Sequence, residues 1–200
     1  MIKRAFDACL AAAGLLASAP LWALFAAAIK LEDGGPVFFE QDRVGLAGRT
    51  FKALKFRSMR PDAERETGPL QARRHDPRVT RIGRVMRATA MDELPQLWNI
   101  LRGDMSFVGP RALRPGEIEM EGGLAVPLEA VPGFERRIVV RPGLTGIAQV
   151  YASRSIPRRH KFRYDALYIK RRSMWLDLRL ILVSFWISFR GTWESRGRKR

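Results

Sequence analysis

The chain has 200 residues, enough for one domain with a hydrophobic core but too few for two independent ones. Its 36 lysines and arginines against 20 aspartates and glutamates give a formal charge of +16, which predicts a polyanionic partner such as nucleic acid, anionic lipid or a diphosphate. The single cysteine, Cys9, excludes a disulfide framework, and the two histidines are too few to build a zinc site.

An apolar segment rich in alanine and leucine occupies residues 8–29. As a helix it would measure about 33 Å at 1.5 Å per residue, which is enough to span a bilayer. A cleaved signal peptide is one alternative, because Lys3 and Arg4 precede the segment and residues 17–19 resemble a cleavage site. Pro20, directly after that site, disfavours cleavage.

Both flanks of this segment are basic, although positive charge normally stays on the cytoplasmic side. A straight span would leave either the two leading cations or Lys30 on the wrong side, whereas a helix that returns through the same leaflet satisfies both. Pro20 removes a backbone donor near the middle, and Ser18 can offer its hydroxyl to the group that is freed. We therefore expect a re-entrant membrane helix with a break over residues 1–31, with a straight span as the alternative.

Two strand-like runs lie between residues 37 and 59, on either side of a glycine-containing turn at residues 45–48. Alternation along the second run places Lys55 and Arg57 opposite Phe56. The predicted β-hairpin therefore presents a basic edge. The polar stretch that follows, residues 61–77, is expected to form a loop.

Two adjacent carboxylates, Asp92 and Glu93, lie between two predicted helices. Arginines recur every third residue over 81–87, and apolar residues recur with helical spacing over 94–101. Pro95 in the first turn of the second helix puts the carboxylates at a helix start, where the dipole favours negative charge. Simple capping is the alternative role for such a pair.

Cations and flexible backbone surround the two carboxylates. The arginine run lies just upstream, and a glycine-containing loop over residues 103–111 lies just downstream. Phosphoryl transfer requires these parts together. Two carboxylates can also hold Mg²⁺ through oxygen ligands while substrate phosphates complete the coordination shell.

The C-terminal part ends in an apolar stretch at residues 180–189. It is too short to span a bilayer, so we expect an amphipathic helix at the membrane interface, with a buried core helix as the alternative. The basic tail, residues 191–200, is expected to adhere to anionic lipid. The fold class predicted is α+β, predominantly helical with a short β-hairpin, and the catalytic domain is expected to cover residues 32–190.

Taken together, these motifs resemble the bacterial sugar transferase family, the monotopic phosphoglycosyl transferases, in its minimal form. The apolar helix and six further pieces carry the resemblance in the family's order: residues 55–59, 87–96, 99–111, 141–149, 165 and 175–178. The resemblance implies that Asp92 attacks the β-phosphorus of a UDP-sugar, expels UMP and forms a covalent phosphosugar-aspartyl intermediate. Undecaprenyl phosphate would then attack that intermediate, and Glu93 would help Asp92 to hold Mg²⁺.

The resemblance also implies the surroundings of the reaction. It assigns substrate binding to Lys55, Arg87, Arg111, Arg141 and Asp165. It implies the bacterial inner membrane, a catalytic domain on the cytoplasmic face, and the first membrane step of exopolysaccharide, O-antigen or glycoprotein glycan assembly. The expected partners are the UDP-sugar, undecaprenyl phosphate and anionic membrane lipids, but not nucleic acid, and a homodimer is compatible with the family.

Three positions depart from the family's common pattern. Ser18 lies two residues before Pro20, where the family often has serine directly before proline. Ala112 follows Arg111 where a proline is common, which loosens a loop that is expected to contact the nucleotide. Residues 151–153 replace a common Asn-Gly-Arg, a difference that concerns the choice of sugar.

Two other classes of protein fit part of the sequence. A membrane-tethered nucleic-acid-binding protein accounts for the charge, and its aromatic content of 10% would permit base stacking, but Asp92 and Glu93 stay unexplained. A membrane scaffold without catalysis predicts that Asp92→Asn is silent. The sequence has no Walker A, Gly-x-Ser-x-Gly or His-Glu-x-x-His motif, which excludes the corresponding kinase-like, hydrolase and zinc-protease sites.

Overall fold

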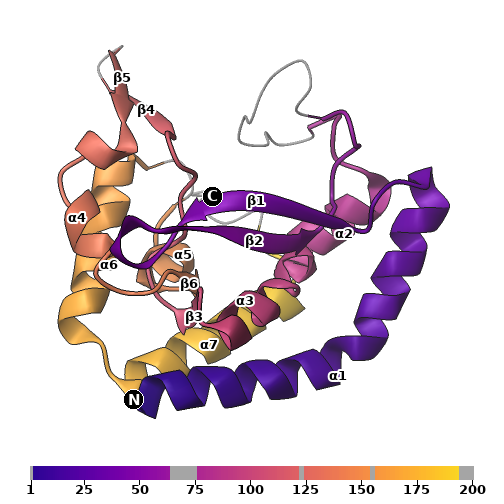
Figure 1. The fold of residues 1–200 in the computed structure, drawn as a ribbon, viewed down its shortest axis with the longest axis horizontal. Helices are drawn as coiled ribbons and strands as arrows, with labels where there is room; N and C mark the ends of the chain where they lie inside the picture. The colour runs from indigo at the N-terminus through magenta and orange to yellow at the C-terminus, as the bar shows by residue number, and fades with distance from the viewer. Residues whose placement is uncertain (1, 64–75, 122–123, 154–155, 194–200) are drawn as a thin grey trace.

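The computed structural model describes residues 2–63, 76–121, 124–153 and 156–193 (Figure 1). Within these residues the chain is predominantly helical and forms three small two-stranded sheets, which confirms the predicted fold class in outline. Most of the predicted loop at 61–77 and most of the basic tail lie outside the described residues.

Helix α1 (Ile2–Asp33) is the longest element and contains Pro20. It runs along the lower edge of the molecule and then turns upward, so that one helix forms two arms (Figure 1). Proline inside a helix removes a hydrogen bond and displaces the carbonyl four residues earlier, which accounts for such a bend. By length and composition, α1 is long and apolar enough to cross a membrane.

The predicted break is thus a bend within one continuous helix. The Ser18 hydroxyl accepts a hydrogen bond from Trp22 Nε1 at 3.1 Å and donates to the carbonyl of Leu15 at 3.4 Å. The carbonyl displaced by Pro20 belongs to Leu16, so the serine bonds one residue away from the group that the sequence predicted.

Strands β1 (Phe38–Val44) and β2 (Thr50–Phe56) form the predicted antiparallel hairpin around the short helix η1 (Leu46–Gly48). At its base, Phe56 stacks on Phe38 and meets Phe25 of α1 edge-on, with ring centroids 5.5 and 5.7 Å apart. This aromatic cluster fixes the second arm of α1 against the hairpin.

The two helices predicted around the carboxylates are α2 (Arg81–Thr89) and α3 (Gln96–Arg102), and the 3₁₀ turn η2 (Met91–Glu93) lies between them. Beyond α3, the three-residue strands β3 (Ser106–Val108) and β6 (Gly143–Thr145) pair in parallel. The pairing joins two motifs that lie far apart in the sequence.

The remaining elements form one side of the molecule in Figure 1 and its lower layer. They are β4 (Ile118–Glu121), β5 (Leu124–Pro127), η3 (Leu128–Ala130), α4 (Phe134–Arg137), α5 (Ile147–Tyr151), α6 (Arg158–Arg171) and α7 (Met174–Phe189). The main core includes Ala11 of α1, Ile100 of α3, Val108 of β3 and Leu180 of α7.

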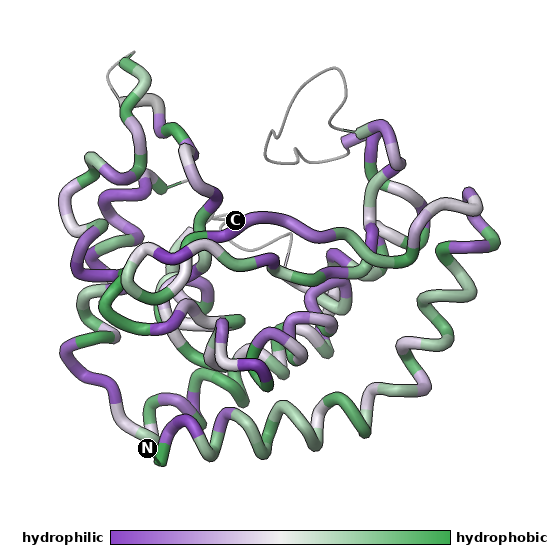
Figure 2. Tube along the Cα trace, viewed as in Figure 1, coloured by the Kyte–Doolittle hydropathy of each residue, from purple (hydrophilic) through white to green (hydrophobic). Residues whose placement is uncertain are grey.

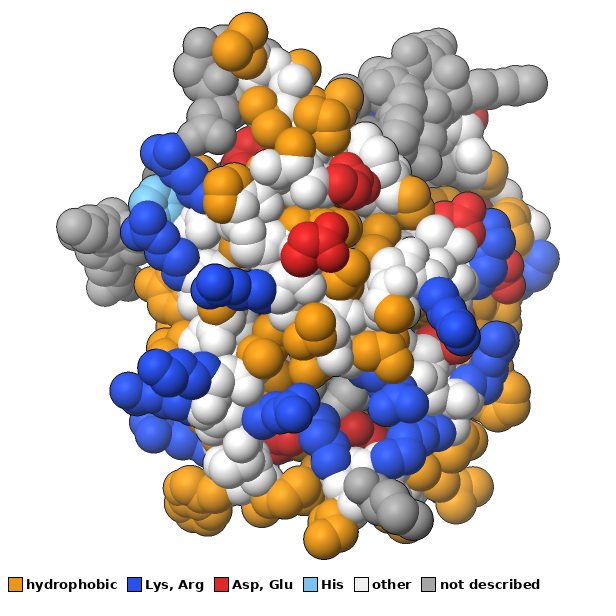
Figure 3. Space-filling model, turned by 60° about the vertical axis from the view of Figure 1, so that its left-hand side comes forward, with side chains coloured by type: hydrophobic (Ala, Val, Ile, Leu, Met, Phe, Trp, Pro, Cys, Tyr) orange, Lys and Arg blue, Asp and Glu red, His pale blue; other side chains and the backbone are white. Residues whose placement is uncertain are grey.

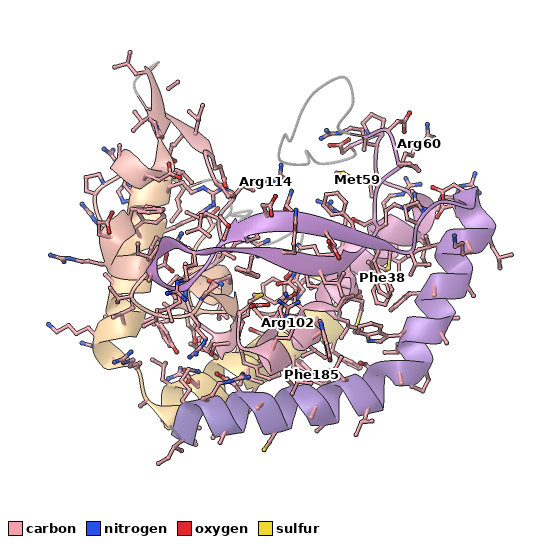
Figure 4. The ribbon with its side chains drawn as sticks, in the orientation of Figure 1. Phe38, Met59, Arg60, Arg102, Arg114 and Phe185 are labelled. Atoms are coloured by element: carbon pink, nitrogen blue, oxygen red, sulfur yellow. The ribbon has the colours of Figure 1, made fainter. Side chains whose placement is uncertain are left out.

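Helix α7 is buried in the core on one face only. Leu180 and Ile187 are buried in the core, whereas Leu182, Phe185 and Phe189 are 68%, 71% and 75% exposed. In Figure 2 the lower edge, formed by α1 and α7, is coloured mainly as hydrophobic, and Figure 4 labels Phe185 there. The helix therefore packs by one face and leaves an apolar face uncovered.

Candidate active site

The turn between α2 and α3 carries the two carboxylates. Helix α2 ends at Ala90, which has the left-handed backbone conformation (φ 57°, ψ 21°), and the chain then enters η2 with Asp92 and Glu93. A left-handed alanine is uncommon and is retained where the surrounding structure holds it. Asp92 is only 9% exposed.

Glu93 is held by two cations and does not act as a helix cap. Lys55 Nζ lies 2.5 Å from Glu93 Oε1, and the Arg111 guanidinium lies 3.3 Å from the same oxygen. The predicted basic edge of the hairpin therefore faces the carboxylates at Lys55. Arg57, its predicted companion, instead pairs with Asp33 at the end of α1.

A buried amide fixes the strand that carries Lys55. The Asn99 side chain of α3 accepts a hydrogen bond from the Leu54 amide at 3.0 Å and donates to the Lys52 carbonyl at 2.7 Å. Because β2 is fastened to α3 in this way, Lys55 has a defined position relative to the carboxylates. The sequence analysis did not identify Asn99 individually, although it lies within the motif 99–111.

The two adjacent carboxylates have opposite pKa shifts. Burial raises the pKa of Asp92 to about 6, with Glu93 adding to the rise and Lys55 and the nearby arginines opposing it. For Glu93, burial would also raise the pKa, but Lys55 and Arg111 outweigh it and hold the pKa well below its usual range. Glu93 therefore stays ionised, whereas Asp92 binds a proton more readily than an ordinary aspartate.

Among the described residues, no hydrogen bond or ion pair engages the Asp92 carboxylate. A buried carboxylate without such partners is available to react or to bind a cation. The described residues contain no group of three or more histidine, cysteine, aspartate or glutamate side chains able to enclose a metal ion. The two adjacent carboxylates fit Mg²⁺ only as partial ligands, with waters or substrate phosphates supplying the remaining oxygens.

An open, basic pocket lies beside Glu93. Its lining residues are Arg43, Ala53, Lys55, Glu93, Gln96, Met105, Arg111, Ala112, Gly143 and Leu144. Three cations against one carboxylate favour an anionic occupant. Arg43 was not predicted: it lies on β1 outside any motif, and only the fold brings it here.

The environment of Arg43 is strongly basic. Burial, together with repulsion from Arg111 and Arg114, lowers the pKa of Arg43 to about 10. Figure 4 labels Arg114 close to β1. Arg43 also donates to the carbonyl of Ala112 at 2.9 Å, which ties β1 to the loop after Arg111.

Glycines allow the Arg111 loop to cross the 141–146 segment. A Cβ on Gly143 would lie 2.0 Å from the Gly109 amide nitrogen, and one on Gly109 would lie 2.4 Å from the Arg141 carbonyl oxygen. The Gly143 amide donates to the Pro110 carbonyl at 2.9 Å. The close approach of the two backbones explains why both motifs contain glycine.

The predicted substrate-binding residues divide into two groups. Lys55 and Arg111 line the pocket, and Arg87 is close enough to Asp92 to influence its pKa. Arg141 and Asp165 are not part of that lining. The Arg141 guanidinium donates to the Gly103 carbonyl at 2.8 Å, at the end of α3.

Asp165 is linked to the pocket through a second arginine. Its carboxylate pairs with Arg137 Nε at 3.2 Å, and both side chains are 5% exposed. Arg137 also donates to the Arg111 carbonyl at 2.6 Å and stacks over the Phe162 ring. The pair thus holds the backbone that presents Arg111. Sequence reasoning missed Arg137, which no motif marks.

A buried carboxylate with a raised pKa, next to an ion-paired carboxylate and a basic pocket, is an arrangement that favours an anionic ligand. A model of the bacterial sugar transferase family matches residues 1–191, and the chain belongs to that family of transferases.

Three curated relatives show the extent of the similarity. The undecaprenyl-phosphate glucose phosphotransferase of Komagataeibacter xylinus is 45% identical over 187 residues, covering 91% of this chain but only 35% of the relative. The UDP-glucose:undecaprenyl-phosphate glucose-1-phosphate transferase of Caulobacter vibrioides is 44% identical, with 90% and 67% covered. The exopolysaccharide production protein PSS of Rhizobium leguminosarum bv. phaseoli is 41% identical, with 90% and 92% covered.

Proposed function

We propose that the protein transfers a sugar 1-phosphate from a UDP-sugar to undecaprenyl phosphate and releases UMP. The observation that carries this proposal is the buried, unengaged carboxylate of Asp92 beside a basic pocket, in a chain of the sugar transferase family. The name of the Caulobacter relative, which specifies a UDP-glucose donor and an undecaprenyl-phosphate acceptor, supports the two substrates.

The first step is attack by an Asp92 oxygen on the β-phosphorus of the donor. A new oxygen–phosphorus bond forms, the bond from that phosphorus to the bridging oxygen breaks, and the bridging oxygen leaves with UMP. The sugar phosphate is then held on Asp92 as a mixed anhydride of carboxylic and phosphoric acid. This is covalent catalysis, which divides a difficult exchange into two steps.

In the second step, a phosphate oxygen of undecaprenyl phosphate attacks the same phosphorus. The bond to Asp92 breaks, the free carboxylate is restored, and the product is a polyprenyl-diphosphate sugar. Two polyanions must therefore approach a carboxylate in turn, and Lys55, Arg43 and Arg111 lower the repulsion between them. We assign Arg111 to the nucleotide side of the donor.

Mg²⁺ is the proposed cofactor, with Asp92 and Glu93 as its protein ligands. When bound, it would neutralise diphosphate charge and orient the donor. The carboxylates of the chain would offset the charge of the metal, and its cations would offset the charge of the diphosphate. Glu93 Oε1 is already paired with Lys55 and Arg111, so its other oxygen is the one available to a metal.

We propose that α1 enters the membrane and returns on the same side. Its first turns bond to the catalytic body through Arg4, and its last turn bonds to the same body through Glu32 and Asp33. A helix with both ends on one body does not fit a straight span. The bend supports a re-entrant path at the inner membrane, with the catalytic body on the cytoplasmic face and glycan assembly as the process served.

The uncovered face of α7 would lie at the membrane interface. Figure 3 supports this orientation: hydrophobic side chains gather along the lower edge, and lysine and arginine side chains form a band directly above them. Leu182, Phe185 and Phe189 would enter the acyl boundary while the cations meet anionic headgroups.

The test is UMP release from purified, lipid-reconstituted protein supplied with UDP-sugars, UDP-glucose first, and with undecaprenyl phosphate and Mg²⁺. Asp92→Asn should abolish UMP release and leave liposome attachment intact, because it removes the nucleophile and keeps the shape. Asp42→Asn, the same change at an exposed ion pair, is the matched control. Mass spectrometry of protein given donor alone should detect a phosphosugar adduct at Asp92; full activity of the Asp92→Asn variant would contradict the proposal.

A further inference from the structure

The two helices that flank the carboxylates are each held at the far end by helix α1. Helix α2 begins at Arg81 and leads toward Asp92, and α3 leads away from Glu93 and ends at Arg102. The ends that lie away from the carboxylates are therefore the N-terminus of α2 and the C-terminus of α3. These are the two ends that charged residues of α1 bind.

Glu32 caps the N-terminus of α2. Its two carboxylate oxygens accept hydrogen bonds from the amides of Arg81 at 2.6 Å and Ile82 at 3.0 Å. The next amide, that of Gly83, is bound by the Thr80 hydroxyl at 3.0 Å. The first amides of a helix lack partners within the helix and carry partial positive charge, so an anion stabilises them.

Arg4 caps the C-terminus of α3. Its guanidinium donates to the carbonyls of Ile100 and Leu101, in the last turn of that helix. The last carbonyls of a helix lack partners within the helix and carry partial negative charge, so a cation is the complementary group there. One helix thus supplies an anion to the positive end of α2 and a cation to the negative end of α3.

Apolar packing likewise joins one end of α1 to α3 and the other end to α2. In the first arm of α1, Ala11 is fully buried in the cluster that contains Leu97 and Ile100 of α3. In the second arm, Phe25 and Ile29 pack with Met86 of α2. Each arm therefore packs against one of the two helices and ends in the charged residue that caps it.

We propose that α1 sets the angle between α2 and α3 and thereby the geometry of the turn that carries Asp92 and Glu93. Helices α2, α3 and the bent α1 form a closed ring, with the carboxylates at one corner and the Arg4 and Glu32 contacts at two others. Opening that corner requires a cap to break or the bend of α1 to change. Arg4 and Glu32 are in this sense positioning residues, which act on the site without touching substrate.

The left-handed residue at the corner supports this role. Ala90 joins α2 to the turn with φ 57°, a left-handed conformation that is unfavourable for alanine relative to the right-handed one. Such a conformation persists only where the flanking structure enforces it. The Ala90 amide bonds to the carbonyls of Met86 and Arg87 at the end of α2, and we expect the two far caps to add to that local restraint.

We call the hold of α1 on α2 and α3 through Glu32 and Arg4 the clamp. A distance measurement tests it without reference to catalysis. In a Cys9→Ser background, spin labels at Val85→Cys on α2 and Trp98→Cys on α3, both at exposed positions, report the separation of the two helices. We expect a narrow distance distribution in the lipid-reconstituted protein and a broader or shifted one in Glu32→Ala and Arg4→Ala. A second label pair, at Arg84 and Arg102, checks that the labels do not cause the change.

Matched controls separate the clamp from loss of charge. Glu40→Ala removes an exposed glutamate of β1, and Arg163→Ala removes an exposed arginine of α6. Both should leave the distance distribution unchanged. Unchanged distributions in Glu32→Ala and Arg4→Ala would overturn the proposal. If either alanine variant fails to fold, Glu32→Gln and Arg4→Lys decide the question by the same measurement.

A second test measures catalysis, and it rests on the proposed function. Displacing reacting groups by about 1 Å can cost about 100-fold in rate, so we expect kcat for UMP release to fall about tenfold or more in Glu32→Ala and Arg4→Ala. The donor KM should change less, because the pocket lining is retained, and liposome attachment should persist. Values of kcat within about twofold of wild type would contradict a positioning role. If the unaltered chain releases no UMP, the proposed function fails while the distance measurement still decides the clamp.

Discussion

The buried ion pair of Asp165 and Arg137 tests how the Arg111 loop is held. Replacing Asp165 by asparagine preserves the shape but leaves the Arg137 guanidinium buried without its counterion. Breaking a buried pair from one side costs about 3–5 kcal/mol. At about 2–4 °C per kcal/mol for a chain of this size, the midpoint of thermal unfolding should fall by about 10 °C.

The assay is thermal unfolding of the reconstituted protein, followed by tryptophan fluorescence. Asp42→Asn is the control, because the Asp42–Lys52 pair has both side chains more than half exposed and should contribute about 0–1 kcal/mol at most. A fall of similar size in both variants would refute the reasoning, since burial would then have no bearing on the cost.

The double variant Asp165→Leu/Arg137→Met separates stability from positioning. Removing both charges together should recover most of the lost stability, because no buried charge is left unpaired. UMP release should nevertheless be lower than in the wild type, because the Arg111 carbonyl has lost the hydrogen bond from Arg137. Recovery of activity together with stability would show that the pair does not position Arg111.

Four further outcomes follow from the site. In the proposed function the ionised form of Asp92 is the nucleophile. Because burial raises its pKa to about 6, the rate of UMP release should rise with pH through about 6 and then level off. Lys55→Met removes a cation that lowers this pKa, and should move the rise to higher pH and reduce kcat; an unchanged profile would exclude Lys55 as a neighbour of the nucleophile. Gly143→Ala brings a methyl group to within 2.0 Å of the Gly109 nitrogen and should lower stability by about 3 kcal/mol or more in chemical unfolding, with loss of activity. Chelation with EDTA should stop UMP release, and added Mg²⁺ should restore it; turnover that persists in chelator would rule out the metal assignment.

The sequence identified those parts of the fold that short-range patterns specify. The hairpin with Lys55 and the two helices around Asp92 and Glu93 were predicted, because alternation and helical spacing extend over seven or more residues in most of them. The parallel pairing of β3 with β6 was not predicted. Each strand has only three residues, and their partners lie more than thirty positions away.

The roles of individual charged residues were harder to predict from the sequence than the helices and strands. Glu32, Arg43 and Arg137 lie in no motif, and each acts on a group brought to it by long-range packing. Asp165, which the family resemblance assigns to substrate binding, pairs with a buried arginine that no pattern marked. A sequence pattern identifies a charged residue without identifying which backbone group or side chain it will meet.

Both anchors of α1 belong to the same body, and this affects how foreign sequence can be attached to the protein. If α1 takes the re-entrant path proposed above, no hydrophilic segment before or after it has to pass through hydrocarbon, a transfer that costs several kcal/mol for each charged residue. A fluorescent reporter fused ahead of Ile2 would therefore remain in the compartment of the catalytic body. A flexible linker that spares the Arg4 contacts should be enough for the fusion to keep its fold.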